Sequence, residues 1–99
     1  MKRKNIKSLI RNKILNRRLI NRIITIEQHS DPNLIGISGT IRNESKNMLL
    51  LELAETRAIS VAKSTGVFKF KIEEIDICID GVHLIGDQKS RAKKKFRNW

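Results

Sequence analysis

Between positions 34 and 53, apolar residues share one parity on each side of a polar break at 43–47, and this pattern limits the fold more than any other feature. The apolar positions are Ile35, Ile37 and Ile41 before the break and Leu49, Leu51 and Leu53 after it. A period of two is typical of strands that bury one face, so the segment predicts a long β-hairpin. Gly36 and Gly39 lack a Cβ atom, which lets the first arm bend sharply or approach another backbone closely.

Three further segments repeat the period of two after this hairpin. They lie at 57–63, 67–72 and 75–79. In the second of them Phe68 and Phe70 alternate with Lys69 and Lys71, so we expect the aromatic rings inside and the lysines outside. Turn-forming residues separate the segments, as is typical of strands joined in sequence order.

The residues after position 79 predict one more turn and one more strand. Asp80-Gly81 is a strong signal for a two-residue hairpin turn, and Val82 and Leu84 are expected to form a last short strand. Five or six short strands within 31–87 predict an all-β fold, a small and strongly bent antiparallel barrel. We expect the barrel to be closed or nearly closed, because closure removes edge strands that would pair with other chains.

The size and composition fit one small domain. The chain has 99 residues, of which 39% are hydrophobic and only 4% aromatic, so its core must be built mainly from Ile, Leu and Val. The apolar runs are too short to span a membrane, and Lys and Arg interrupt the N-terminal segment too often for a signal peptide; a cytoplasmic location is therefore expected. Cys78 is the single cysteine, which excludes an internal disulfide, and no Cys/His set has zinc spacing.

The positive charge is concentrated at the two ends of the chain. Residues 1–22 hold nine Lys or Arg residues and residues 88–99 hold six, and neither segment contains an acid. All ten acidic residues lie at 23–87 beside six basic ones, within a total net charge of +11. Two cationic ends repel each other and are natural sites for a polyanion. A membrane surface is the less favoured polyanion, because the ends contain few Trp and Phe residues.

Residues 1–30 predict a basic amphipathic extension. Its apolar residues follow helical spacing and are Ile6, Leu9, Ile10, Ile14 and Ile24. A helix this cationic is marginal alone in water, so we expect it to order on binding RNA or a protein partner. The alternative is a surface helix packed on its own domain. Pro32 ends the segment because proline disfavours helix at the preceding residue, and the β region is predicted to begin at Leu34.

The other end of the chain predicts a short basic helix or tail at 88–99, which Asp87 would cap. The sequence thus divides into three parts. They are the extension at 1–30, the β-barrel at 31–87 and the tail at 88–99.

Side chains able to carry out catalysis are sparse. His29 and His83 lie far apart in sequence, and a surface or hairpin role is the simpler interpretation of both. The acidic cluster at 73–76 lacks the glycine-bearing loop of a calcium site, so a solvated strand edge explains it better. Cys78 has no second cysteine to pair with and is interpreted as a small strand residue. We therefore expect a protein that binds rather than one that performs chemistry itself.

Several short sequence features occur in a consistent order across residues 30 to 95. They are Leu34–Ile41, Asn43–Leu49, Ala62–Lys63, Phe68–Phe70, the Gly81 turn and Arg91 in the basic tail. As an ordered set they resemble archaeal ribonuclease P protein component 1, a family shared with a protein of eukaryotic ribonuclease P and MRP. The resemblance implies an Sm-like barrel of about six strands with terminal extensions that order in the complex.

The resemblance also implies a function. It points to a monomeric RNA-binding subunit of a ribonucleoprotein, beside a catalytic RNA that removes the 5′ leader from precursor tRNA. Its implied partners are the ribonuclease P RNA, precursor tRNA indirectly, and a small zinc-binding protein subunit. The active site and its Mg²⁺ ions would belong to the RNA, so no catalytic residue and no protein-bound cofactor are implied.

The same resemblance, together with the charge distribution, selects eight candidate RNA-binding residues, all at the cationic ends. They are Arg11, Arg17, Arg18, Arg22, Arg91, Lys93, Lys94 and Lys95. Two alternatives stay open on the sequence alone. One is a ribosomal-type or Sm-like structural protein that binds RNA with similar tails, and the other is a small hydrolase using Asp76 or His83.

Overall fold

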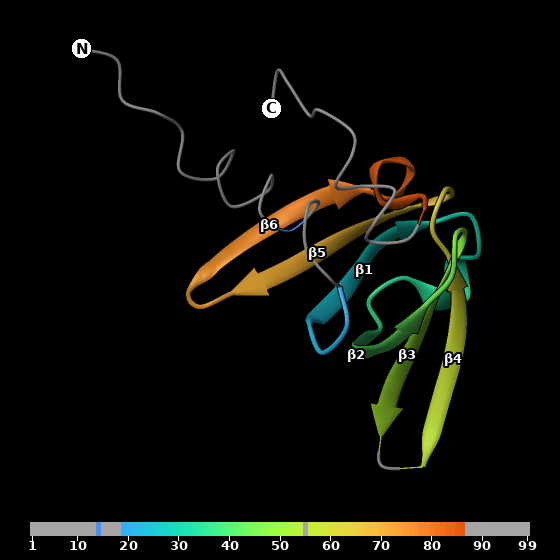
Figure 1. Cartoon of the computed structure of the whole chain (residues 1–99), viewed down its shortest axis with the longest axis horizontal. Coiled ribbons are helices and arrows are strands. Elements are labelled where there is room, and N and C mark those ends of the chain that lie inside the picture. Colours follow the sequence, from blue (N-terminus) through green and yellow to red (C-terminus); the bar gives the residue numbers. More distant parts are fainter. Residues whose placement is uncertain (1–13, 15–18, 55, 87–99) are drawn as a thin grey trace.

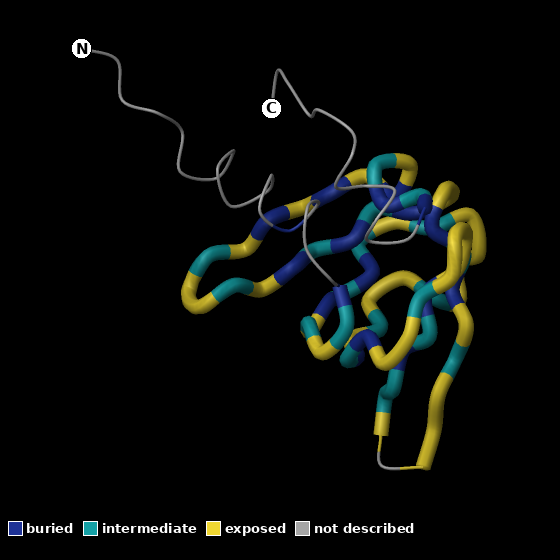
Figure 2. Tube along the Cα trace, viewed as in Figure 1, coloured by how far each residue is buried: buried dark blue, intermediate teal, exposed yellow. Residues whose placement is uncertain are grey.

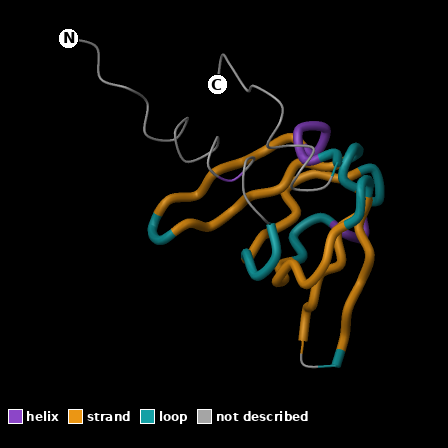
Figure 3. The backbone as a smooth tube through the Cα atoms, viewed as in Figure 1, coloured by secondary structure: helices purple, strands orange, loops and turns teal. Residues whose placement is uncertain are grey.

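The computed structural model describes residue 14 and residues 19–54 and 56–86, and these ranges contain six antiparallel strands (Figure 1). The strands are β1 (Ile23–His29), β2 (Ser38–Glu44), β3 (Met48–Ala54), β4 (Arg57–Ala62), β5 (Gly66–Ile72) and β6 (Ile75–Asp80). Two short 3₁₀ helices lie between and after them, η1 (Pro32–Leu34) and η2 (Gly81–Leu84) (Figure 3, purple). The all-β prediction is confirmed. In the described ranges no helix is both long enough and apolar enough to cross a bilayer.

The strands form one bent sheet in the order β4-β3-β2-β1-β5-β6. Register shifts in the β1–β5, β2–β3 and β3–β4 ladders mark bulges, which bend a sheet and increase its twist. The β3–β4 and β5–β6 hairpins consequently point in different directions (Figure 1). The predicted strong bend is confirmed. Within the described residues β4 and β6 share no ladder, so strand pairing does not close the sheet into a barrel.

The first strand corrects the sequence prediction, which placed Ile24 on an N-terminal helix and began the β region at Leu34. Ile23–His29 is instead strand β1, which pairs with β2 on one side and β5 on the other. Ile24 and Ile26 are buried on one parity, and Ile24 lies opposite the buried Phe70. Pairing with two strands therefore outweighs the helical spacing of the apolar residues, and β-branched residues favour the strand. The sheet begins at Ile23, not at Leu34.

The end of the sheet gives a second correction. Asp80-Gly81 does not form a two-residue hairpin turn, and Val82 and Leu84 lie in η2 rather than in a strand. The Asp80 carboxylate accepts the backbone N–H of Val82 at 3.2 Å and so caps this helix. A Cβ atom on Gly81 would overlap the carbonyl oxygen of Lys63, so glycine lets η2 approach the end of β4 at this point.

The predicted hairpin at 34–53 is confirmed as the pairing of β2 with β3, with a later start. Its first arm begins at Ser38 because Leu34 belongs to η1 and Gly36 has a φ of +88°. Ile35 is 49% exposed rather than inside. Gly39 shows the expected close approach, since a Cβ atom there would lie 2.9 Å from the carbonyl oxygen of Glu52.

The hydrophobic core lies inside the bend and receives residues from every strand (Figure 2). Its buried members in the described residues are Ile14, Leu19, Ile24, Ile26, Ile41, Leu49, Leu51, Val61, Phe68, Phe70, Ile77, Ile79 and Leu84. Ile14 and Leu19 precede the sheet, and Ile14 is helical. At these two positions the N-terminal segment packs on its own domain, which was the alternative to ordering on a partner. Residues 19–22 of the predicted N-terminal helix form a turn instead. The remaining residues of that helix, and the predicted C-terminal helix, lie outside the described residues.

Leu19→Ala tests the packing of the N-terminal segment. Because Leu19 is fully buried, we expect its truncation to lower the free energy of unfolding by about 2–5 kcal/mol. Ile35→Ala is the control, since the exposed Ile35 should contribute only about 0.5 kcal/mol. Urea unfolding of both variants measures the difference. Equal stabilities would show that residue 19 is not part of the core.

Candidate nucleic-acid interface

The described residues contain no arrangement typical of a catalytic or metal site. No group of three or more His, Cys, Asp or Glu side chains in residues 14, 19–54 and 56–86 could hold a metal ion. Cys78 is exposed on β6, Asp76 is exposed opposite Lys71 of β5, and His83 is half-buried in η2. The structure therefore brings neither candidate of the hydrolase alternative into a catalytic cluster.

His29 has a structural role at the end of β1. Its Nδ1 accepts the backbone N–H of Asp31 at 3.0 Å, so the neutral ring carries its proton on Nε2. Nε2 then donates to the carbonyl oxygen of Ala62 at 3.1 Å. The ring also lies edge-on to Phe68, with 6.4 Å between the ring centroids. His29 thus joins the end of β1 to the end of β4.

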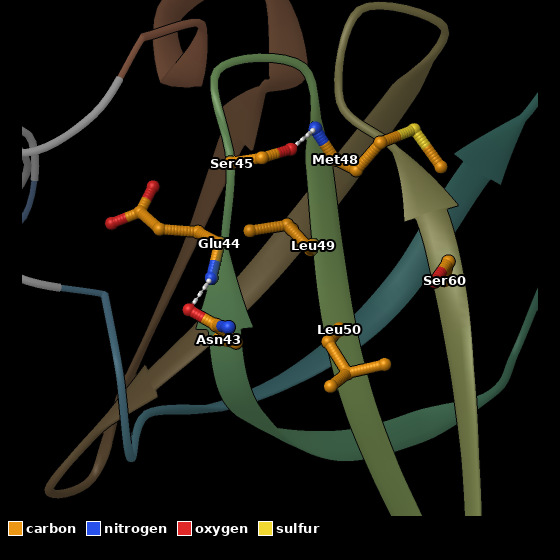
Figure 4. A pocket seen from close by; sticks show the side chains of 7 residues that line it. All are labelled: Asn43, Glu44, Ser45, Met48, Leu49, Leu50 and Ser60. Atoms are coloured by element: carbon orange, nitrogen blue, oxygen red, sulfur yellow. Dashed lines mark hydrogen bonds between the residues drawn. The ribbon is translucent and has the colours of Figure 1, made fainter.

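Two surface cavities of the described residues are candidate ligand sites. The first, of about 190 Å³, lies where β2 and β3 meet their turn, next to β4 (Figure 4), and it is lined by Asn43, Glu44, Ser45, Met48, Leu49, Leu50 and Ser60. The second, of about 290 Å³, is lined by Gln28, His29, Ser64, Thr65, Gly66, Val67 and Asp80. Both are smaller than typical small-molecule sites, and neither brings a nucleophile and a base together.

The charges of the described domain nearly balance. Residues 19–54 and 56–86 hold seven Lys or Arg and eight Asp or Glu residues. Three ion pairs join them: Arg42 with Glu52 at 2.8 Å, Lys63 with Glu44 at 2.9 Å, and Lys69 with Glu27 at 3.4 Å. The excess positive charge of the protein therefore belongs to residues 1–18 and 87–99.

A buried lysine fixes the point where the C-terminal end leaves the sheet. Lys63 is fully buried, and its Nζ donates to Glu44 Oε1 at 2.9 Å, to Ser45 O at 2.7 Å and to Gly86 O at 2.9 Å. A buried ammonium group needs such acceptors, because desolvation without them is costly. The backbone N–H of Gly86 also donates to Lys46 O at 2.7 Å. Gly86, the last described residue, is thus tied to the β2–β3 turn.

The segment before β1 is attached to strand β2, which precedes the turn that holds Gly86. The backbone N–H of Asn21 donates to Ile41 O at 2.7 Å, and the N–H of Ile41 donates to Arg22 O at 2.9 Å. Arg42 reinforces this contact, since its Nη1 donates to Asn21 Oδ1 at 2.9 Å and its Nε to Glu52 Oε1 at 2.8 Å. Asn21 has a φ of +74°, a left-handed conformation that asparagine adopts more readily than most residues. The chain before β1 is therefore held beside the middle of β2.

Of the eight predicted RNA-binding residues, the structure describes Arg22. It is half-buried, and its Nε is buried with no hydrogen-bond partner among the described residues. The others lie outside the described residues, and they are Arg11, Arg17, Arg18, Arg91, Lys93, Lys94 and Lys95. What the structure adds is the attachment of Asn21 and Gly86, described residues that lie toward the two ends.

Sequence reasoning missed the roles of Lys63 and Arg42. For Lys63 a signal was present: it continues the parity of Ile59 and Val61, so the period of two places it on the inward face. For Arg42 no sequence signal existed, because its partners Asn21 and Glu52 are brought together only by the sheet.

The chain is similar to protein subunits of ribonuclease P. Residues 12–94 match the family model for ribonuclease P/MRP subunit p29. Ribonuclease P protein component 1 of Methanosarcina mazei is 34% identical over 93 residues, covering 82% of this chain and 84% of that protein. The protein of the same name from Methanocaldococcus jannaschii is 32% identical over 84 residues, covering 85% and 88%. A solved structure described as Mth11, a homologue of human RNase P protein Rpp29, superposes with a TM-score of 0.56 at 30% identity, covering 76% of this chain and 97% of that one.

Lys63→Met tests the buried hydrogen-bond centre. Removing the ammonium deletes a buried ion pair with Glu44, whose side chain is only 7% exposed, so we expect a loss of about 3–5 kcal/mol in unfolding free energy. Lys69→Met is the matched control, because its half-exposed ion pair should be worth less than about 1 kcal/mol. The double variant Lys63→Met/Glu44→Gln should regain part of the loss, since it buries no charge. Chemical denaturation measures all three, and equal stabilities of the two single variants would contradict this role of Lys63.

Proposed function

The chain belongs to the ribonuclease P/MRP subunit p29 family and is a protein subunit of ribonuclease P, and we propose that it binds the RNA of that enzyme through its two cationic ends. The observation that carries the proposal is the separation of charge. The described domain is nearly neutral, whereas the two ends together hold the whole positive excess. Lys and Arg side chains on flexible stems neutralise phosphates and supply most of the affinity of such contacts.

In this proposal the sheet positions the ends and the ends contact RNA. The bent sheet, with its core, Lys63 and Arg42, fixes where each end begins. The catalytic site that removes the 5′ leader from precursor tRNA would lie in the RNA together with its Mg²⁺ ions. The protein would neutralise phosphates whose mutual repulsion opposes the compact RNA. It would act as a monomer within the ribonucleoprotein, in the cytoplasm.

A protein partner is also part of the proposal. We expect a small zinc-binding subunit to contact the N-terminal segment and a neighbouring strand. In support, Ile23 on β1 is 56% exposed directly after that segment.

The assignment of RNA contacts to the ends is tested with matched triple substitutions in the full chain. One variant carries Arg11, Arg17 and Arg18→Gln and a second Lys93, Lys94 and Lys95→Gln, while the control carries Arg57, Lys69 and Lys71→Gln on the sheet. Substitution is preferable to removal of residues 1–22, because removal would also delete the buried Ile14 and Leu19.

Binding of each variant to a transcript of archaeal ribonuclease P RNA is measured across a range of salt concentrations. If about six phosphates are neutralised, the plot of log affinity against log salt has a slope of roughly −4 to −5 for the unmodified chain. Each lost phosphate contact should reduce that slope by about 0.7–0.9, in the two end variants and not in the control. A reduced slope in the control variant alone would show that the RNA contacts lie on the sheet. Absence of RNA binding by the unmodified chain would refute the proposal.

Co-purification from the source cells distinguishes the proposed function from the alternative of a ribosomal-type protein. Ribonuclease P RNA in the recovered complex supports the proposed function. Recovery with ribosomal particles instead would favour the structural role.

A further inference from the structure

We propose that the free edge of strand β4 is a protein-docking surface, where an extended segment of another ribonuclease P subunit adds one strand to the sheet. The edge of a sheet exposes backbone N–H and C=O groups, and a strand from another chain can bind them. In the described residues β4 pairs with β3 alone, and it lies on the outside of the sheet (Figure 1). The contact is independent of the assignment of RNA contacts to the two cationic ends.

The hydrogen-bonding pattern shows which backbone groups of β4 are available. The N–H of Lys63, the residue after β4, donates to Asn47 O at 2.9 Å, so residues of this parity face β3. Residues of the other parity direct their N–H and C=O groups away from β3, and they are Ala58, Ser60 and Ala62. The carbonyl oxygen of Ala62 already accepts from His29. Ala58 and Ser60 therefore form the open edge.

The two edges of the sheet differ in their protection against added strands. The outer strand β6 carries Asp76 and Asp80, both exposed, and charged side chains discourage pairing at an edge. Between residues 58 and 62, β4 carries neither a charge nor a proline. The register shift in its ladder with β3 comes before this stretch, so the stretch is regular. The edge of β4 thus lacks the features that keep an edge unpaired, as is typical of an edge that pairs within an assembly.

A cavity beside this edge can receive a side chain of the added strand. Ser60 lies opposite Leu50 of β3, and both line the cavity of about 190 Å³ together with Met48 (Figure 4). A cavity of roughly 150 Å³ with apolar walls is large enough for a benzene ring, so this one has room for one large apolar side chain. Such a side chain would also remove Met48, which is 37% exposed, from water.

Cations flank both ends of the edge. Arg57 begins β4, and Lys46 precedes Asn47, which is bonded to the residue after β4. Both cations are exposed and belong to none of the ion pairs of the described residues. At about 3.3 Å per residue, β4 covers roughly 17 Å. The segment that fits is an extended stretch of about five residues, with a large apolar side chain in its middle and an acidic residue toward each end.

A second copy of this chain fits the edge less well. An antiparallel pair of β4 strands would place the small side chains of Ala58, Ser60 and Ala62 beside the same row of the other copy, so no large side chain would enter the cavity. It would also bring Arg57 of each copy toward Lys46 of the other, and a parallel pair would bring the two Arg57 side chains together. Like charges at these positions repel each other.

Hydrogen exchange measures the edge directly, with the full chain free and within ribonuclease P purified from the source cells. In the free chain the amides of Ala58 and Ser60 should exchange rapidly, whereas those of Ile59 and Val61, which face β3, should be protected and serve as references. In the enzyme the Ala58 and Ser60 amides should exchange at least about tenfold more slowly. Equal rates in the two samples would overturn the proposal. Protection that rises with the concentration of the free chain would assign the edge to a second copy and would also overturn it.

Matched substitutions identify what covers the edge. Ser60→Lys places a charge in the middle of β4 and in the cavity, and Cys78→Lys makes the same change at an exposed position of β6. Each variant is expressed with a tag in the source cells, and the RNA and the protein subunits that co-purify are quantified. The Ser60→Lys complex should retain ribonuclease P RNA but lose one protein subunit by at least about tenfold relative to the RNA. The Cys78→Lys complex should retain all subunits.

A full set of protein subunits in the Ser60→Lys complex would overturn the proposal, and stronger RNA binding by that complex would assign the edge to RNA instead. Equal loss of a subunit from the Cys78→Lys complex would overturn it as well, because the effect would not be specific to β4. Urea unfolding of the free variants controls for folding. If Ser60→Lys does not fold, Ala58→Lys repeats the test at the other open position of the edge.

Discussion

The buried ammonium of Lys63 is the interaction on which the arrangement of this small domain depends. The sheet has two edge strands that share no ladder in the described residues, so its ends are not held by strand pairing. Lys63 follows the edge strand β4 and binds the end of β2, the turn after β2 and Gly86. His29 adds a bond from the end of β1 to Ala62, and Gly81 allows η2 to approach the same place. Polar contacts thus hold the ends of this sheet, whereas in a closed barrel a strand ladder would join them.

This arrangement separates the role of the sheet from that of the ends. A core of this size leaves a small margin of stability, and Ile14 and Leu19 from the N-terminal segment complete it. The N-terminal end is therefore not an independent tail, because part of it is needed for folding and its cations start from a packed position. The C-terminal end is attached differently, through the Lys63 ammonium, at a point beside the same strand.

The sequence predicted most of the strands, but it did not predict the elements whose conformation is decided by tertiary contacts. The period of two predicted β3, β5 and β6 and the burial of Phe68 and Phe70, because those strands bury one face and alternate clearly. It failed for β1, whose isoleucines also fit helical spacing and whose strand exists only through pairing with β2 and β5. The sequence also did not predict η2. Asp-Gly is typical of a hairpin turn, and only the structure shows that Gly81 closely approaches the Lys63 backbone. The attachment of Asn21 and Gly86 to β2 and its turn was not predictable, since it depends on hydrogen bonds between residues far apart in the chain.

The geometry has a consequence for how such a subunit recognises its RNA. Contacts between Lys or Arg and phosphates supply affinity but carry no sequence information. In the proposed function, selectivity therefore comes from how the domain holds its ends, since a folded RNA must present phosphates where the Lys and Arg residues are held. Arg42 holds Asn21 and Lys63 holds Gly86, and neither side chain needs to touch RNA. Loosening either anchor should therefore reduce discrimination between folded RNAs more than it reduces binding to RNA in general.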